Sequence, residues 1–599
     1  MSPRPSPSRS THTPRRGGTD PRTDRESLLS REVGATRKPH GGRLRVALAF
    51  PNSYFVGMSN LGLQTVYQLF NADERVVCER VFLPGKNELR AGSRDPLVTM
   101  ESGTPVRDFD IFAFSVSFEW DYTNVVTMLR LAGLDPRSAR RTWQDPLVLI
   151  GGAVTFVNPE PLAPFADVIA AGEAELLVPA LVDAIADVGT RDRAGLLRRL
   201  VEATGFYIPS LYDVTYDGPG RVAAISPKPG SGAPAIVRKA AVKAADRLDP
   251  PSTTIFTPDT EFGSRLLIEV VRGCANLCRF CWAGYNYLPV RPFSTERILQ
   301  IAEAARPYAN RVGLVSIALC DHPDIELILE RLIALGYGIS PASLRLDDLT
   351  EPIVRFLRQS GERSITIAPE TGSDRLRRVI NKTVTNEQIL DRADLIFRNG
   401  IENLKLYFMI GLPTEEDADL VAIRDLVTAL RDRMVEHSRE RGTIGRLVAS
   451  VNPLVPKPGT TYQWMPMTHA SVIEEKSDRL RRLVADLENV YFNIKSERHS
   501  FYQGLLSLGD RRVADVIEIA EGNGGNWRAA VAESGLDAAA YLYRDRGADA
   551  FLPWQIIDGG VKSAFFRDEL AKSHRAEWTL PAKRARLVGD NVPVLTPDA

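Results

Sequence analysis

The first third of the chain alternates short apolar runs with stretches of helical periodicity. A helix is expected over residues 61–70, and four apolar runs predict strands at residues 45–50, 111–116, 147–150 and 167–170. Strands and helices in this rhythm indicate a Rossmann-like, doubly wound parallel sheet. Ligands of such sheets bind beyond the carboxyl ends of the strands, and here Gly151 and Gly152 follow the third of these runs.

A second series of apolar runs follows at helix-length spacing. These runs lie at residues 266–271, 312–318, 343–346, 364–367, 404–409 and 446–451. Six such βα units predict a partial (β/α)6 barrel, open on one side, with its functional groups at the carboxyl ends of the strands. After it, Ser471 and Glu474 have the spacing of a capping box, which predicts a long helix leading into a small, mostly helical C-terminal module.

These patterns divide the α/β chain into five regions. We expect a disordered tail rich in Arg, Pro and Ser at 1–42, a Rossmann-like domain at 43–190, a connecting segment at 191–262, the barrel at 263–470 and the C-terminal module at 471–599. The tail is expected to be disordered because it has almost no large apolar side chains to bury.

The composition narrows the class of protein. Basic and acidic residues number 75 each, so the chain has no net positive charge that would favour binding of nucleic acid. A local basic patch is compatible with this balance. An odd count of five cysteines argues against a disulfide framework. Without an apolar run of roughly 18 residues or a leader, we expect a cytoplasmic protein with no membrane partner. A short basic stretch with Lys583, Arg584 and Arg586 is either solvated or a polyanion contact.

Three of the cysteines lie together directly after the predicted strand at 266–271. Cys274, Cys278 and Cys281 are separated by three and two residues, and Gly273 lets the chain turn into their loop. Thiolates this close indicate a metal site. Three ligands can hold three irons of a 4Fe-4S cube and leave the fourth iron without a protein ligand. The alternative is structural zinc, which needs a fourth ligand such as Cys320 or His322.

The C-x3-C-x2-C spacing, with Phe280 before the last cysteine, resembles the signature of the radical S-adenosylmethionine (SAM) superfamily. The resemblance implies that the open iron of a 4Fe-4S cluster binds SAM. Reductive cleavage of SAM then gives a 5'-deoxyadenosyl radical that abstracts hydrogen from a substrate. A flavodoxin- or ferredoxin-like electron donor is expected as a partner. A non-catalytic iron-sulfur protein acting in assembly, sensing or RNA binding is the alternative function.

The resemblance also implies cofactor contacts after the strand at 364–367. Glu370 is expected at the ribose of SAM, where a carboxylate can accept hydrogen bonds from hydroxyls, with Gly372 and Ser373 in the same turn. Independently, Ser373 suits the N-cap of a helix over residues 374–380. Glu370 also suits a second role, which is to stabilise that helix N-terminus.

Three further contacts with SAM are implied at other strand ends. Asp321 is expected near the amino group, a role that backbone carbonyls can also fill. Gly411 is expected to let the adenosyl group pack closely, and the alternative is an ordinary turn. Pro456 is expected either to form a wall near the adenine or to close the barrel.

The N-terminal region resembles the cobalamin-binding domain of many radical SAM enzymes, with Gly151, Gly152 and the stretch 172–175 in equivalent places. This resemblance makes cobalamin a candidate second cofactor for a methylation or rearrangement. No histidine lies between residues 41 and 321, so this domain offers cobalt no imidazole. A Rossmann-like domain without the cofactor is the alternative. Residues 46–52, 56–64 and 78–84 resemble one branch of these proteins whose substrate is unassigned. Members of that branch sit near ribonuclease and ribosomal-protein genes, which hints at RNA or ribosome maturation.

Overall fold

The computed structural model describes residues 21–85, 96–341, 344–346 and 349–579 of the chain. Its N-terminal sheet has the strand order β2-β1-β3-β4-β5-β6, and all neighbours are parallel except β5 and β6. The strands are β1 (Leu44–Phe50), β2 (Val76–Phe82), β3 (Ile111–Ser115), β4 (Leu147–Gly151), β5 (Val168–Ala170) and β6 (Phe206–Tyr207). The predicted doubly wound sheet is confirmed. Because β1 lies between β2 and β3, the order reverses there, and ligands of such sheets bind at this switch.

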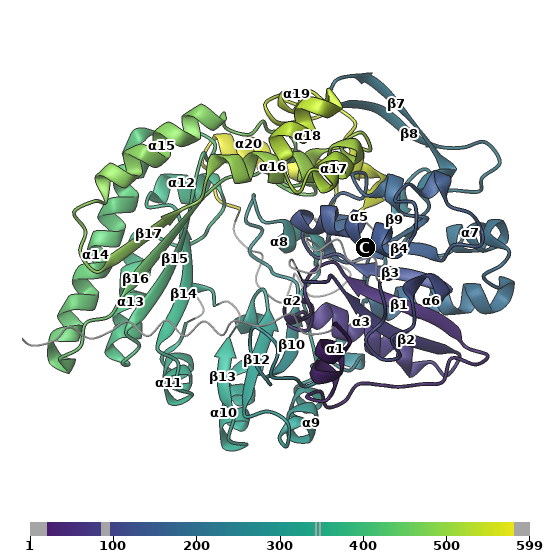
Figure 1. The fold of residues 1–599 in the computed structure, drawn as a ribbon. Helices are drawn as coiled ribbons and strands as arrows, with labels where there is room; N and C mark the ends of the chain where they lie inside the picture. Colours follow the sequence, from purple (N-terminus) through teal and green to yellow (C-terminus); the bar gives the residue numbers. More distant parts are fainter. Residues whose placement is uncertain (1–20, 86–95, 342–343, 347–348, 580–599) are drawn as a thin grey trace, which may run out of the picture.

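Helices cover both faces of this sheet (Figure 1). One face buries α3 (Leu61–Ala72), α6 (Ala174–Val188) and α7 (Arg193–Val201), and the other buries α5 (Tyr122–Leu131). The short α2 (Tyr54–Gly57) precedes α3. The connecting segment adds the hairpin of β7 (Tyr212–Gly218) and β8 (Arg221–Pro227), and its β9 (Val237–Arg238) pairs with β18 (Ile557–Asp558) near the C-terminus.

The expectation of a disordered tail is wrong for residues 21–42. Residues 21–29 form α1 (Pro21–Leu29), and Val33 pairs with Phe256. Glu32 forms an ion pair of 2.7 Å with Arg80, and both side chains are 1% exposed. A buried partner of this kind holds the segment, although its composition offers little apolar surface. The rest of the predicted tail lies outside the described residues.

The second half of the chain forms two four-stranded half-sheets rather than one continuous sheet (Figure 1). The first has the order β11 (Arg291–Pro292), β10 (Leu266–Arg272), β12 (Arg311–Ser316) and β13 (Gly338–Pro341). The second has the order β14 (Ser364–Glu370), β15 (Asn403–Ile410), β16 (Leu447–Pro453) and β17 (Val490–Ile494). Within the described ranges no strand pairing joins β13 to β14, so closure of a barrel is not observed.

The six predicted strands of this half are present, with one displacement. The third lies at 338–341, not at 343–346, where the described residues 344–346 are not in a strand. A strand that was not predicted, β17, extends the second half-sheet from beyond residue 470. The surrounding helices are α9 (Thr295–Ala305), α10 (Ile325–Ala334), α11 (Glu351–Gln359), α12 (Asp374–Val379), α13 (Asn386–Arg398) and α14 (Asp417–Arg441).

The C-terminal module is mostly helical, as predicted. It comprises α15 (Ala470–Leu483), α16 (Glu497–Leu508), α17 (Val513–Gly522), α18 (Trp527–Ser534), α19 (Ala538–Leu542) and α20 (Ser563–His574). The predicted capping box is wrong, because α15 begins before Ser471 and its N-cap is His469. The basic stretch with Lys583, Arg584 and Arg586 lies outside the described residues. None of the helices described is both long and apolar enough to span a membrane.

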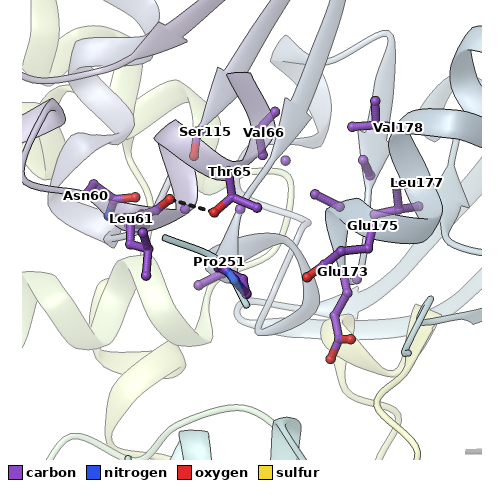
Figure 2. A pocket seen from close by; sticks show the side chains of 18 of the residues that line it. Asn60, Leu61, Thr65, Val66, Ser115, Glu173, Glu175, Leu177, Val178 and Pro251 are labelled. Carbon is purple, nitrogen blue, oxygen red and sulfur yellow. Dashed lines mark hydrogen bonds between the residues drawn. The ribbon is translucent and has the colours of Figure 1, made fainter. Parts of the chain in front are cut away.

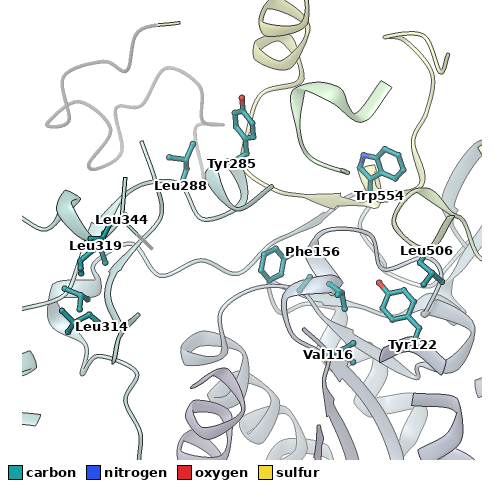
Figure 3. Close-up of a cluster of buried hydrophobic side chains, with 14 of the residues drawn as sticks. Val116, Tyr122, Phe156, Tyr285, Leu288, Leu314, Leu319, Leu344, Leu506 and Trp554 are labelled. Atoms are coloured by element: carbon teal, nitrogen blue, oxygen red, sulfur yellow. The ribbon is translucent and has the colours of Figure 1, made fainter. Parts of the chain in front are cut away.

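The main hydrophobic core continues from the N-terminal sheet into the rest of the molecule. Figure 3 shows Val116, Tyr122 and Phe156 of the N-terminal region in the same buried cluster as Leu288 and Trp554. Helix α17 also packs on α5, and in the loop after α5 Arg137 Nε lies 2.7 Å from Glu518 Oε2 of α17. The C-terminal module is therefore tied both to the N-terminal domain and to the half-sheets.

Candidate functional site

The three clustered cysteines lie on the loop between β10 and α8 (Trp282–Asn286). Gly273 starts this loop with φ +97°, and a Cβ there would lie 2.6 Å from the carbonyl oxygen of Tyr287. Only glycine satisfies both constraints, as the turn predicted from sequence requires. Cys274 and Cys278 are buried and Cys281 is half-buried.

The thiols of this loop lie in an environment that favours the neutral form until a metal binds. Burial raises the pKa of Cys281 to about 11, with the neighbouring Cys274 thiol adding to the effect. Burial likewise raises the pKa of Cys278, while Lys382 opposes the shift. Coordination to a metal deprotonates a thiol outright, so a cluster would supply the positive charge that these sulfurs lack.

A site for a single metal ion, such as structural zinc, is the alternative for this loop. Across the described part of the chain, no three His, Cys, Asp or Glu side chains converge closely enough to hold one metal ion. A cube binds each cysteine sulfur to a different iron, so its ligands need not converge on one point. Of the two candidate fourth ligands of a zinc site, Cys320 and His322, the histidine uses both ring nitrogens: Nε2 lies 2.8 Å from the Phe293 carbonyl oxygen, and Nδ1 lies 3.1 Å from the Asp324 backbone nitrogen.

An arginine inside the cysteine motif anchors the loop, a role that the sequence analysis missed. The side chain of Arg279 is fully buried, and its Nε lies 3.0 Å from Glu569 Oε2 on α20. Its guanidinium also donates to the backbone carbonyls of Arg378, Val379 and Glu577 at 2.7, 3.0 and 2.9 Å. The loop is thereby fixed to both α12 and the C-terminal helix. Its only sequence signal is a charged residue between two closely spaced cysteines.

The aromatic residue of the motif, Phe280, packs onto an apolar cluster beside α12. That cluster consists of Leu376, Val379, Ile380, Leu412 and Tyr462. Phe280 is half-buried against it. The structure thus gives Phe280 a packing role next to the cysteines, and its contact with SAM stays a prediction.

The predicted ribose-binding carboxylate lies at the cysteine loop. Glu370 ends β14 with φ +65°, a conformation that strains a residue other than glycine and often marks functional sites. Burial raises the pKa of Glu370, which Lys382 opposes from 3.3 Å. The same carboxylate and ammonium influence the thiols of Cys278 and Cys281. The structure therefore brings Glu370 and the cysteines together, as the strand-end argument predicted.

The two residues after this turn have clear structural roles. A Cβ on Gly372 would lie 2.1 Å from the backbone of Ala422, so α14 packs directly against this glycine. Ser373 is the N-cap of α12, and its side chain accepts a hydrogen bond of 3.3 Å from the Leu376 backbone. The predicted cap is confirmed, and the helix ends at Val379. A role for either residue in binding SAM stays a prediction.

The remaining predicted contacts lie at other strand ends. Asp321 is 2.7 Å from Arg345, which also donates to Asn276 of the cysteine loop at 3.1 Å. Asp321 therefore reaches that loop through an arginine. Gly411 has φ +76°, and its backbone donates to a carboxylate on the following turn. Pro456 is buried in the loop after β16.

A cavity of about 480 Å³ lies at the carboxyl edge of the N-terminal sheet. Figure 2 shows Asn60, Leu61 and Thr65 on one side of it and Glu173 and Glu175 on the other. Its other wall comes from β10, β12 and the start of the cysteine loop, and includes the following residues: Glu269, Val271, Arg272, Gly273, Tyr287, Val315, Ser316 and Ile317. The volume falls within the range of roughly 300–1,000 Å³ that is usual for small-molecule sites.

Both glycines predicted for this region line the cavity. Gly152 has φ +100°, and a Cβ there would lie 2.3 Å from the Val116 carbonyl oxygen. Gly151 ends β4, and its added Cβ would meet only ordinary contacts at 3.8 Å or more. Gly152 is therefore required by the turn itself, while Gly151 leaves room at the cavity wall.

Ion pairs join the cavity wall to the strand that leads into the cysteine loop. Arg272 lies 2.9 Å from Glu173, 2.8 Å from Glu175 and 2.7 Å from Glu269. Arg291 lies 2.8 Å from Glu173. Burial alone would raise the pKa of Glu173, but the two arginines outweigh it and lower that pKa to about 2. The segment 172–175 thus holds the N-terminal domain against the residue that precedes Gly273.

Aromatic side chains connect the cavity wall to the residue that follows the last of the three cysteines. Phe156 stacks on Trp282 at 5.6 Å between ring centroids, and Trp282 contacts Tyr287 edge-on at 5.5 Å. Phe156 and Tyr287 line the cavity, and Trp282 directly follows Cys281. Lys239, which the sequence analysis missed, lies 5.4 Å from the Phe156 ring centroid, and burial lowers the pKa of its ammonium to about 8.

Comparison with known proteins agrees with this arrangement. Residues 62–209 match the family described as radical SAM proteins, N-terminal, and residues 268–427 match the radical SAM superfamily. An uncharacterized protein of Methanocaldococcus jannaschii is 26% identical over 478 residues, which cover 79% of this chain and 90% of the relative. A tRNA-2-methylthio-N(6)-dimethylallyladenosine synthase of Acidithiobacillus ferrooxidans is 27% identical over 28% of this chain and 41% of its own.

Solved structures resemble the chain at low sequence identity. The radical S-adenosylmethionine methyltransferase TsrM from Kitasatospora setae, with cobalamin and a 4Fe-4S cluster bound, is 12% identical with a TM-score of 0.47. The match covers 83% of this chain and 99% of that one.

Proposed function

This chain belongs to the radical SAM superfamily, whose members use a 4Fe-4S cluster and SAM, and we propose that Cys274, Cys278 and Cys281 hold that cluster. A bound cluster supplies one electron that breaks a carbon–sulfur bond of SAM, which yields methionine and a 5'-deoxyadenosyl radical that takes hydrogen from the substrate. The electron donor in this proposal is a flavodoxin- or ferredoxin-like protein. The observation that carries it is the place of the strand-end carboxylate of Glu370, which lies 3.3 Å from Lys382, beside Asn381, whose side chain donates to the Leu277 carbonyl of the three-cysteine loop.

The protein's own groups orient the reactants. In this proposal Glu370 accepts hydrogen bonds from the ribose hydroxyls, and Lys382, 3.3 Å away, opposes the rise in the pKa of Glu370 that burial causes. The same ammonium stabilises negative charge on the sulfurs of Cys278 and Cys281. Arg279 fixes the loop backbone, and Phe280 with its apolar cluster limits access of water from that side.

We propose cobalamin as a second cofactor, bound in the cavity, and methyl transfer as the reaction class. The support is the cavity's place at the switch point of the sheet, with the strand that leads into the cysteine loop as its opposite wall. No histidine is among the residues that line the cavity, so a bound corrinoid would have no imidazole ligand from it. Phe156 and Tyr287 would line the corrinoid site, and Gly273, which begins the cysteine loop, lines the same cavity, so the two cofactors would be neighbours.

The test of cleavage is anaerobic reconstitution with iron and sulfide, followed by dithionite and SAM. We expect 5'-deoxyadenosine from the wild type and none from Cys274→Ala, Cys278→Ala or Cys281→Ala, each of which also lacks the iron of the cluster. Cys320→Ala and Cys78→Ala are the controls and should keep their iron. A reducible cluster that never cleaves SAM would support the alternative of a non-catalytic iron-sulfur protein.

The cobalamin proposal has a separate test. Protein isolated without air from cobalamin-fed cells should show corrinoid absorption, and methyl-labelled SAM should label the corrinoid. Absence of both would refute the second cofactor without touching SAM cleavage.

RNA is the candidate substrate class, since the partial similarity to the tRNA-modifying synthase covers 28% of the chain.

A further inference from the structure

The inner face of the second half-sheet is not packed as a barrel core. Along β15, Leu404, Leu406 and Phe408 point toward the helices and are fully buried. The alternate residues Lys405 and Tyr407 are exposed, and Tyr407 retains 43% of its surface. Interiors of complete α/β barrels are filled by layers of side chains, so an exposed face here is available to a ligand.

Strand register places the exposed residues in rows across this face. Lys405 pairs with Val448, which pairs with Tyr491, and Tyr491 is 55% exposed. The next row toward the carboxyl ends consists of Tyr407, Ser450 and Asn493. The row after that contains Met409 and Asn452, beside the strand that ends at Glu370. The rows thus run toward the carboxyl ends of the strands, where Met409 packs against the same apolar cluster as Phe280 of the cysteine loop.

The charge of this face favours an anionic ligand. The inner positions that share a row with Lys405 or Tyr407 carry no carboxylate, and Glu370, at the end of β14, is paired with Lys382. Lys405 adds an exposed ammonium, and the guanidinium of Arg446 lies 5.0 Å from the centroid of the Tyr491 ring. Asn452 Oδ1 is buried without a hydrogen-bond partner, which leaves an acceptor for a ligand hydroxyl.

We propose that this inner face binds unpaired nucleotides of an RNA substrate and leads one of them to the cysteine loop. Exposed tyrosines offer stacking surfaces for bases, and the cations meet phosphates. The hydroxyl and amide groups of Ser450, Asn452 and Asn493 suit the 2'-hydroxyl, which both donates and accepts hydrogen bonds. That the bound RNA is a substrate rests on the proposed radical SAM function, whereas RNA binding to this face does not depend on it.

The experiment measures binding of a fluorescein-labelled, unstructured 12-nucleotide RNA to the full-length, anaerobically reconstituted protein by anisotropy. Tyr407→Ala and Tyr491→Ala should each weaken binding roughly five- to 150-fold, the range that loss of one stacked base implies. Lys405→Gln should reduce the slope of log affinity against log salt concentration by about 0.7. The control Tyr308→Ala removes a tyrosine that is 49% exposed elsewhere and should leave binding unchanged.

The outcomes separate this inference from the proposed function. Equal loss in Tyr308→Ala, equal affinity for DNA of the same sequence, or equal competition by an unstructured acidic peptide would overturn it. Production of 5'-deoxyadenosine without RNA binding would refute the RNA face and leave SAM cleavage standing. RNA binding that depends on Tyr407 and Tyr491, without 5'-deoxyadenosine, would refute the proposed function alone. Thermal unfolding midpoints of the variants should match the wild type, since both tyrosines are exposed.

Discussion

Removal of the carboxylate that pairs with Arg279 tests whether the C-terminal helix is part of the cluster site. In Glu569→Ala, the Arg279 guanidinium stays buried among backbone carbonyls without its counter-charge. Breaking a buried ion pair by removing one partner costs about 3–5 kcal/mol. Glu569 also accepts hydrogen bonds from Lys572, at 3.1 Å, and from Thr579, so α20 loses several contacts at once.

The expected effect on the cluster follows from the place of Arg279 between Cys278 and Phe280. If the whole loss of about 3 kcal/mol, the lower of the two figures, destabilises the closed loop, the population of locally opened loop rises up to about 150-fold. Iron should then be lost to a chelator correspondingly faster. The assay combines urea unfolding with the rate of iron loss to bathophenanthroline, both without air.

A matched control is Asp478→Ala, which removes the partner of Arg481 from a pair whose side chains are 53% and 54% exposed. Such surface pairs are worth about 0–1 kcal/mol, so stability and iron retention should stay close to the wild type. Glu569→Gln keeps the shape of the side chain and a hydrogen-bond acceptor, so its stability to urea and its rate of iron loss should lie between those of the wild type and Glu569→Ala. If Glu569→Ala behaves like Asp478→Ala in both assays, α20 does not hold the cysteine loop.

Three further predictions concern the cavity and the groups around it. Gly152→Ala should destabilise more than Gly189→Ala, because both have positive φ but only the former meets a carbonyl, that of Val116 at 2.3 Å; equal urea midpoints would contradict this. Glu173 has its pKa lowered to about 2, so its stabilisation, on the order of 3 kcal/mol, is present above pH 4.5 and lost as the pH falls toward 2. Glu173→Gln should therefore be less stable than the wild type at neutral pH, and a gap that does not close in acid would refute the assignment. Burial lowers the pKa of Lys239 to about 8, so Lys239→Met should gain stability at pH 7 and lose that gain as the pH rises toward 10.5; a gain independent of pH would point to packing instead.

The regular part of the fold was predictable because its buried strands are nearly all apolar. β1, β3, β4 and β5 satisfy that rule, but β2 does not, since Glu79 and Arg80 lie in a strand whose residues are all buried. Their partners come from distant segments: His40 contacts Glu79 at 2.7 Å and Glu32 contacts Arg80 at 2.7 Å. Local pattern cannot reveal a buried charge whose partner is about 40 or more residues away, and the same pairs order the N-terminal segment.

In the candidate site, too, residues with a local sequence signal were predicted and residues without one were missed. The cysteine spacing and the strand-end position of Glu370 are local signals, and parallel topology brings strand ends together, so their meeting followed from sequence. The pairing of Arg279 with Glu569 spans 290 residues and leaves no periodic trace. Lys239 was missed for a similar reason, because only tertiary packing buries its ammonium and places it beside Phe156.

The cysteine loop is held in place by residues from three separate regions of the chain. Carboxylates of the N-terminal domain hold Arg272 just before it, and Glu569 of the C-terminal helix holds Arg279 within it. From the second half-sheet side, Asn381 donates to the Leu277 carbonyl at 3.2 Å, beside the Lys382 that pairs with Glu370. Since each anchor comes from a different region, the position of the sulfurs relative to the cavity depends on all of them. The cavity and the cysteine loop are thus built as one site, although the residues that form it lie hundreds of positions apart in the sequence.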